Sequence, residues 1–186
     1  MEDNFDLTNL KSDKKKRTNS KAKGSRFERK IATIFNDKFN TKDFSRTPGS
    51  GAFATTHSLP EHLQLHGDLI TPKNFKYCIE CKKGYKNVKI NNLLDYSSQL
   101  WKFIYQSEKD SEKCRKEPMI LFQQDRQPIL AIARDKWFYG CHNTEGDTEY
   151  IKFGKYQSTK YMIVSFEKIL EKWTIQDWFN PDPDAG

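Results

Sequence analysis

The sequence predicts an α/β fold in which helices flank a mixed β-sheet, with core elements in the order αβββαββ and an extension after them. Two observations lead to this prediction. A helical pattern of apolar residues opens the folded part of the chain, and short apolar runs bounded by turn residues alternate with a second helical pattern further on. At 186 residues the chain has the length of one ordinary domain, so we expect these elements to share one core.

The expected domain covers residues 24–179, as a core of residues 24–134 and an extension of residues 135–179. Residues 1–23 are rich in lysine, serine and asparagine and contain few apolar residues, which predicts a disordered basic tail. Such a tail would either aid solubility or act as a flexible arm that adds salt-sensitive phosphate contacts. Residues 180–186 are expected to fray.

The first helix is predicted over residues 26–39. Its apolar residues form one stripe at helical spacing: Phe27, Ile31, Ile34 and Phe35. Glu28 lies beside this stripe, where a glutamate most often pairs with a nearby lysine or arginine.

A short strand over residues 43–47 leads into the small-residue loop of residues 48–52. Such a loop lets backbone N–H groups approach a phosphate, and Arg46 and Ser50 would add a charged fork and a hydroxyl. Loops of this composition are also ordinary turns.

Two strands, over residues 69–70 and 75–81, are predicted to form a β-hairpin around the turn of residues 71–74. Side chains alternate along a strand, so Glu80 and Lys82 share one face and can converge on one point.

Asp68 stands at the start of the partner strand and can reach the same point. Two carboxylates and one ammonium group placed in this way suit a metal-dependent phosphodiesterase. Alternation turns Cys81 to the opposite face from Glu80.

The remaining elements follow in chain order. A helix is expected over residues 91–106, with Gln99 next to its buried stripe. The other expected elements are paired strands over residues 119–123 and 129–133, strands over 150–156 and 161–165, and a helix over 166–173.

The net charge of +7 and a pI near 9.1 favour an anionic partner, of which nucleic acid is the commonest. No apolar run has the length of a transmembrane helix, so we expect no membrane partner. The acidic start at residues 1–4 and the lack of an apolar run after it argue against a signal peptide. We expect a cytoplasmic protein, in the host cytoplasm if a phage encodes it.

In the cytoplasm the four cysteines are expected to stay reduced. Cys78 and Cys81 have zinc-ligand spacing, but residues three apart on a strand point to opposite faces, and no second pair completes a tetrahedral set. His57, His62 and His66 match no standard ligand spacing either. Small buried residues are the favoured interpretation of the two cysteines.

Several segments together resemble the PD-(D/E)XK nuclease superfamily, and within it the Holliday junction resolvases of archaea and phages. The segments are the helix with Glu28, the run from Arg46 to Gly51, Gly67-Asp68, Glu80-Cys81-Lys82, and the helix with Gln99. The resemblance covers about residues 24–134. It implies a restriction-endonuclease-like core, a divalent metal and hydrolysis of DNA phosphodiester bonds.

The order of these segments gives the resemblance its specificity. The acidic-x-Lys triplet also occurs at Asp13-Lys14-Lys15 and at Glu28-Arg29-Lys30, but only Glu80-Cys81-Lys82 lies on a predicted strand behind an upstream aspartate. The proline that gives the family its name is Gly67 here.

The resemblance implies a role for each site residue. The carboxylates of Asp68 and Glu80 and the Cys81 backbone carbonyl would bind Mg²⁺, or Mn²⁺ in its place, because these ions prefer oxygen ligands. Lys82 would orient or deprotonate the attacking water, or stabilise the charge that develops. Glu28 would bind metal through water or position Lys82, and Gln99 would support the site.

The DNA would contact Arg46 and Ser50, with Lys83, Lys86 and Lys89 as a duplex-binding rim. Three hypotheses remain open: a structure-selective endonuclease that acts as a homodimer on branched DNA, a nuclease of the same superfamily that cuts linear duplex DNA, and a non-catalytic nucleic-acid-binding module.

Overall fold

A computed structural model of the chain describes residues 20–48, 66–136, 149–156 and 159–181. Most of the predicted basic tail, the loop residues 49–52, His57, His62 and Cys141 lie outside the described residues. The elements, in chain order, are α1 (Ser20–Phe39), β1 (Ser45–Arg46), β2 (Leu69–Ile70), β3 (Tyr77–Gly84), the 3₁₀ helix η3 (Ile90–Leu93), α3 (Gln99–Cys114), β4 (Glu117–Gln124), β5 (Leu130–Arg134), β6 (Tyr150–Tyr156), β7 (Thr159–Ser165), α5 (Phe166–Lys172) and α6 (Ile175–Trp178).

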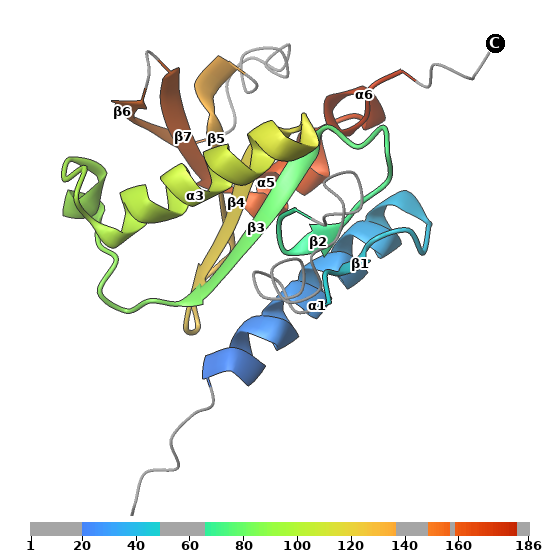
Figure 1. Cartoon of the computed structure of the whole chain (residues 1–186), viewed down its shortest axis with the longest axis horizontal. Coiled ribbons are helices and arrows are strands. Elements are labelled where there is room, and N and C mark those ends of the chain that lie inside the picture. Colours follow the sequence, from blue (N-terminus) through green and yellow to red (C-terminus); the bar gives the residue numbers. More distant parts are fainter. Residues whose placement is uncertain (1–19, 49–65, 137–148, 157–158, 182–186) are drawn as a thin grey trace, which may run out of the picture.

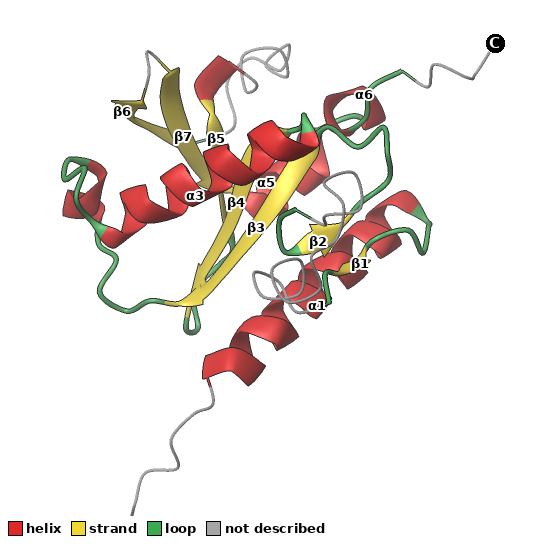
Figure 2. Cartoon of the chain, viewed as in Figure 1, coloured by secondary structure: helices red, strands yellow, loops and turns green. Residues whose placement is uncertain are grey.

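Five strands form one mixed sheet in the order β3-β4-β5-β7-β6 (Figure 2). β3 and β4 are parallel and α3 connects them, whereas the other neighbouring strands are antiparallel. β1 and β2 pair with each other in a separate two-stranded ribbon. The mixed sheet with flanking helices confirms the predicted fold class.

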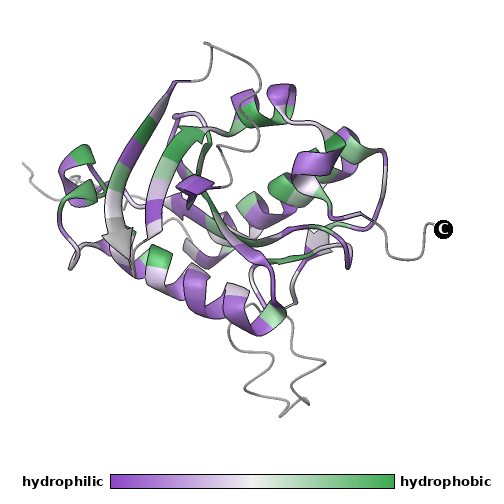
Figure 3. Cartoon of the chain, turned by 90° about the horizontal axis from the view of Figure 1, so that it is seen from above, coloured by the Kyte–Doolittle hydropathy of each residue, from purple (hydrophilic) through white to green (hydrophobic). Residues whose placement is uncertain are grey.

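Helices cover both faces of this sheet (Figure 1). On one face, side chains of α1, α5 and α6 form an aromatic core with β3, β4, β5 and β7. Phe35 stands at its centre, with four other rings between 5.1 and 5.6 Å from its own: Phe44, Phe75, Phe166 and Trp178. Figure 3 shows hydrophobic segments along the strands and hydrophilic stretches on the helices.

On the other face, α3 and η3 cover a second core built around Trp101, which is fully buried. Trp101 packs edge-on against Phe153 of β6 and Tyr161 of β7. The expected strands and helix of the extension form, and β7 continues the main sheet by pairing with β5. Among the described residues, no helix is long and apolar enough to cross a membrane.

The expected hairpin between residues 69–70 and 75–81 does not form, because β2 pairs with β1. The chain that follows β2 is held by the C-terminal segment before it enters β3. Lys76 N donates to Trp178 O (2.8 Å), and Phe75 forms an antiparallel bridge with Phe179.

The helix expected over residues 91–106 lies eight residues further on, because α3 spans Gln99–Cys114. Asp95 Oδ1 accepts hydrogen bonds from the backbone N–H and the hydroxyl of Ser97 (2.9 and 2.7 Å), and this turn separates η3 from α3. α1 likewise begins at Ser20, so Lys21 and Lys23, which we assigned to the disordered tail, belong to a helix.

Candidate active site

β3 carries Glu80 and Lys82 on the face that α3 covers. Glu80 is 3% exposed, and the Lys82 ammonium lies 5.1 Å from the centre of the Phe103 ring of α3. Ile79 and Cys81 point to the other side, into the core beneath α1. The structure therefore shows the alternation that the sequence predicted for this strand.

Asp68 is fixed against the edge of β3 by two hydrogen bonds. Its backbone N–H donates to Ile79 O (2.8 Å), and its Oδ2 accepts from the backbone N–H of Cys81 (2.7 Å). These partners flank Glu80 along the strand, so the carboxylate of Asp68 lies beside that of Glu80. The two groups that the sequence expected to converge do come together, although through backbone contacts instead of a hairpin.

Gly67 makes this placement of Asp68 possible. Its φ is +75°, a value closed to proline and costly for other residues. A Cβ at this position would lie 2.8 Å from Ile79 O and 2.9 Å from Cys78 Sγ. The glycine that replaces the family's proline is thus required by the close approach of this turn to β3.

Glu80, Lys82 and Gln106 form a closed set of polar contacts. Lys82 Nζ forms an ion pair with Glu80 Oε1, and it also donates to Gln106 Oε1 (3.0 Å). Gln106 Nε2 donates in turn to Glu80 Oε1 (2.9 Å). Among the described residues, the polar contacts of Glu80 with Lys82 and Gln106 fall on Oε1, which leaves Oε2 for another partner.

Burial sets the electrostatics of this group. Burial and the neighbouring negative charge of Asp68 raise the pKa of Glu80 to about 7, against the opposing effect of Lys82. Burial lowers the pKa of Lys82, but the charge of Glu80 and its hydrogen bond outweigh this and raise the pKa overall. Two carboxyl groups in a dry site attract a cation, and Lys82 supplies one positive charge.

Glu28 of α1 belongs to the same neighbourhood. It is buried and forms an ion pair with Arg46 Nε of β1. The residue after Arg46, Thr47, donates its backbone N–H to Asp68 O (3.0 Å), which fixes the end of β1 next to the aspartate.

The thiol of Cys81 is buried and feels the charge of all three carboxylates. Burial raises its pKa, and the negative charges of Asp68, Glu80 and Glu28 raise it further.

Two supporting residues lie elsewhere than the sequence predicted. Gln99 is exposed at the first residue of α3, whereas Gln106, two turns further along the same helix, contacts Glu80 and Lys82. Gln99 and Gln106 are seven residues apart and lie on the same side of a helix. A prediction that began the helix at residue 99 would therefore have pointed to Gln106, two turns further along. Ser50 lies outside the described residues.

Of the expected basic rim, Lys83 lies on β3, whereas Lys86 and Lys89 lie after the end of this strand. Lys83 points to the α1 side, where its ammonium lies 5.7 Å from the Phe27 ring and donates to Gln123 Oε1 (2.7 Å). Burial lowers the pKa of Lys83, and the positive charges of Lys23 and Lys30 on α1 add to this effect while Asp125 opposes it.

Lys86 and Lys89 are exposed in the segment that follows β3. Lys23 of α1 was missed as a part of this basic surface because the helix was expected to begin later.

The oxygen donors of the site suit a divalent cation. Asp68 and Glu80 supply two carboxylates, and the Cys81 carbonyl faces the same strand edge as the Cys81 N–H, which donates to Asp68. In the described part of the chain, no three histidine, cysteine, aspartate or glutamate side chains form a complete metal-binding group. A metal held by this donor set would complete its coordination with water or substrate oxygens, as Mg²⁺ commonly does.

Cys78 and Cys81 lie on opposite faces of β3, and both are buried free thiols. Cys78 interacts with Cys114 at the end of α3, and this contact, together with burial, raises the pKa of Cys78. The same contact lowers the pKa of Cys114 to about 7.

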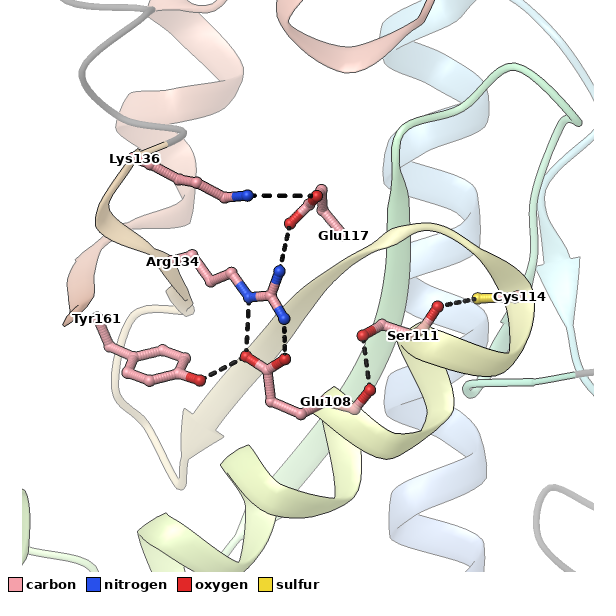
Figure 4. A network of polar contacts seen from close by, with 7 residues as sticks. All are labelled: Glu108, Ser111, Cys114, Glu117, Arg134, Lys136 and Tyr161. Atoms are coloured by element: carbon pink, nitrogen blue, oxygen red, sulfur yellow. Dashed lines mark hydrogen bonds and ion pairs between the residues drawn. The ribbon is translucent and has the colours of Figure 1, made fainter. Parts of the chain in front are cut away.

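A second buried network of polar side chains lies in the C-terminal half of α3, away from η3 (Figure 4). Glu108 is 3% exposed and pairs with Arg134 of β5 and the hydroxyl of Tyr161 of β7. Arg134 also bonds Glu117 of β4 (3.2 Å). This network ties α3 to three strands of the sheet.

Comparison with known proteins assigns the class of this protein. The model of the family described as "Phage putative PDDEXK endonuclease" matches residues 19–180. The chain therefore belongs to this family of PD-(D/E)XK nucleases, enzymes that generally use divalent metals. The match extends past residue 134, where the resemblance noted in the sequence ended.

Among curated proteins, the chain is similar to Protein D14 of Escherichia phage T5. The two are 32% identical over 120 residues, which cover 61% of this chain and 70% of the phage protein. No solved structure matches the chain.

Proposed function

We propose that this nuclease is a metal-dependent DNA endonuclease that selects branched DNA, such as a four-way junction. One observation carries the catalytic part of the proposal: the buried carboxylates of Asp68 and Glu80 lie side by side and next to the Lys82 ammonium. Two such carboxylates are kept ionised together most easily by a bound cation.

Mg²⁺, or Mn²⁺ in its place, would be held by Asp68, Glu80 through Oε2, and the Cys81 carbonyl. When bound, the ion supplies a water of lowered pKa and neutralises charge on the phosphate. Glu28 would reach this ion through a water molecule, since Arg46 already pairs with its carboxylate.

Lys82 acts as a charged donor in this proposal. Its ion pair with Glu80 holds the ammonium beside the site, where it orients the attacking water or stabilises negative charge on the phosphate oxygens. Gln106 positions both side chains through its two hydrogen bonds. The role that the sequence assigned to Gln99 is therefore transferred to Gln106.

The duplex would lie across the end of β3. Lys83, with Lys23 and Lys30 of α1, forms a basic surface at this strand end, and the exposed Lys86 and Lys89 follow it along the chain. Arg46 and Ser50 would contact the phosphates of the cut strand. Lysines bind phosphate without regard to sequence, so this surface favours recognition of DNA shape.

The preference for branched DNA rests on the resemblance to Holliday junction resolvases. Symmetric cleavage of a junction needs two active sites, so we expect two copies of the chain to act together. A nuclease that cuts linear duplex DNA in restriction, repair or phage genome processing would use the same site. A non-catalytic DNA-binding module is less consistent with the site, because such a protein would be free to lose Asp68, Glu80 and Lys82.

The test compares three DNA substrates with identical ends: a four-way junction, a flap and a linear duplex. The protein should cut DNA when Mg²⁺ or Mn²⁺ is added and should not cut in EDTA. Paired symmetric nicks in the junction alone support the proposal. Equal cleavage of the linear duplex would contradict the preference for branched DNA, and no cleavage of any substrate with either metal would contradict the catalytic assignment.

A further inference from the structure

Two large apolar side chains project into solvent from the segment that connects β3 to α3. Ile90 is 71% exposed and Leu94 is 83% exposed, and Tyr85 and Tyr96 of the same segment are 44% and 49% exposed. We call residues 85–96 the η3 segment. It stands at the N-terminal end of α3, at the left of Figure 1.

The η3 segment is held in place by hydrogen bonds at both ends. Gln124 Nε2 donates to the carbonyls of Tyr85 (3.1 Å) and Val88 (2.7 Å). Trp101 Nε1 donates to Leu93 O (3.3 Å), and the Leu93 side chain is buried. Ile90 and Leu94 are thus exposed by a well-anchored backbone.

This exposure has a cost for the isolated protein. Burying a leucine or isoleucine side chain stabilises a fold, and the exposed side chains of Ile90 and Leu94 contribute little of this stabilisation. Two exposed apolar tips on an anchored segment indicate a surface that is covered when a partner binds.

The η3 segment is linked to the active site through one ring. Phe103 of α3 packs edge-on against Tyr85 at 4.7 Å, and the same ring lies beneath the Lys82 ammonium at 5.1 Å. Gln106 follows one turn later on α3. A polymer bound at Lys82 therefore passes next to the η3 segment.

The charge of the segment favours DNA as that partner. Lys86 and Lys89 are exposed between Tyr85 and Ile90, and Asp95 is the one acidic residue of the segment. A two-fold contact between copies of the chain would bring these lysines against each other, which disfavours self-association through this surface. Phosphates would instead neutralise them.

Apolar side chains reach bases where the base stack is open or can be opened. We propose that Ile90 and Leu94 form an apolar wedge that contacts the unstacked bases at a DNA branch point, while Lys86 and Lys89 hold the adjacent phosphates. This inference rests on the proposed function and deepens it, because it assigns the recognition of branched DNA to named side chains.

The test measures base unstacking directly, in EDTA so that no cleavage occurs. A four-way junction and a linear duplex each carry one 2-aminopurine base, which in the junction stands at the branch point. The fluorescence of 2-aminopurine rises when the base unstacks. Wild-type protein should raise the junction signal and leave the duplex signal unchanged. The double variant Ile90→Ser and Leu94→Ser should lose most of this rise, while its affinity for linear duplex, read by gel shift, stays within about two-fold of wild type, a change below 0.5 kcal/mol.

Ile175→Ser is the matched control, because Ile175 is 52% exposed on α6 and belongs to neither the site nor the η3 segment. It should behave as wild type.

An equal fluorescence rise in the double variant, or no rise with wild-type protein, would overturn the inference. So would sedimentation that shows a wild-type dimer and a monomeric double variant, since the surface would then join two copies. Cleavage by wild-type protein is read separately, so failure of the wedge and failure of the nuclease assignment are distinguishable.

Discussion

Gly67 shows how a single residue shapes this site. It sits at positive φ with backbone and sulfur atoms where a side chain would begin, and the next residue supplies a site carboxylate. The family pattern has proline at this place, and a ring that fixes φ near −65° cannot adopt the turn seen here. The departure from the pattern therefore follows from the local backbone.

Gly67→Ala should destabilise the protein by at least about 2 kcal/mol, because the left-handed backbone alone costs roughly 1–2 kcal/mol and the contact with Ile79 O adds to it. Gly24→Ala is the matched control. Gly24 lies in α1, where a Cβ would make an ordinary 3.7 Å contact with Glu28 Oε1, so alanine should stabilise the helix by up to about 1 kcal/mol. Urea unfolding measures both changes, and equal effects of the two substitutions would contradict this account of Gly67.

At the scale of elements, α3 brings the site together with the η3 segment. Its residues Phe103 and Gln106 contact Lys82 from successive turns. The register of this helix therefore decides which glutamine serves the site.

Gln106→Ala should lower the cleavage rate about ten-fold or more, because Glu80 and Lys82 lose the side chain that holds them in place. Gln99→Ala should leave the rate unchanged, because among the described residues the hydrogen bonds to Glu80 and Lys82 come from Gln106 and not from Gln99. A steady-state assay should show the loss mainly in kcat, with the melting temperature little changed. Equal activity of the two variants would show that Gln106 has no positioning role.

The sequence predicted the fold class and the strand that carries Glu80 and Lys82, because alternation and turn residues are local signals. It placed the end of α3 eight residues too early, since the second half of this helix buries polar residues such as Ser107, Glu108 and Ser111. It also predicted a hairpin where β2 pairs with β1. The partners in that pairing, Ser45–Arg46 and Leu69–Ile70, are far apart in sequence, as are Phe75 and Phe179, which bridge the chain after β2 to the C-terminal segment, and no local pattern reveals such contacts.

At the scale of the whole molecule, the extension and the core form one sheet. β7 pairs with β5, and the buried Glu108 joins α3 to Arg134 and Tyr161. Burial and the hydrogen bond to Glu108 raise the pKa of Tyr161. The pKa of an unfolded tyrosine is about 10. Because the pKa of Tyr161 is higher in the folded state, its contribution to stability is complete below about pH 10 and is lost progressively as pH rises above that value.

Tyr161→Phe should therefore destabilise the protein by roughly 1–3 kcal/mol at pH 8, where the hydrogen bond to Glu108 is lost. Between pH 10 and 11 the wild-type protein should lose stability faster than the variant, so the two stabilities should converge. Denaturant unfolding across this pH range measures both. Parallel pH profiles for the two proteins would contradict the raised pKa.

The most direct test of the central claim is the rate of Mg²⁺-dependent DNA cleavage by Asp68→Asn and Glu80→Gln. Both amides can keep the hydrogen bonds that the carboxylates accept from Cys81 and Gln106, but each removes a negative charge that would hold the metal. We predict that both variants lose cleavage by at least about 100-fold while they keep the wild-type melting profile and duplex affinity. Glu171→Gln, on the exposed surface of α5, should cut as wild type does. Cleavage at the wild-type rate by Asp68→Asn and Glu80→Gln would show that the active site lies elsewhere.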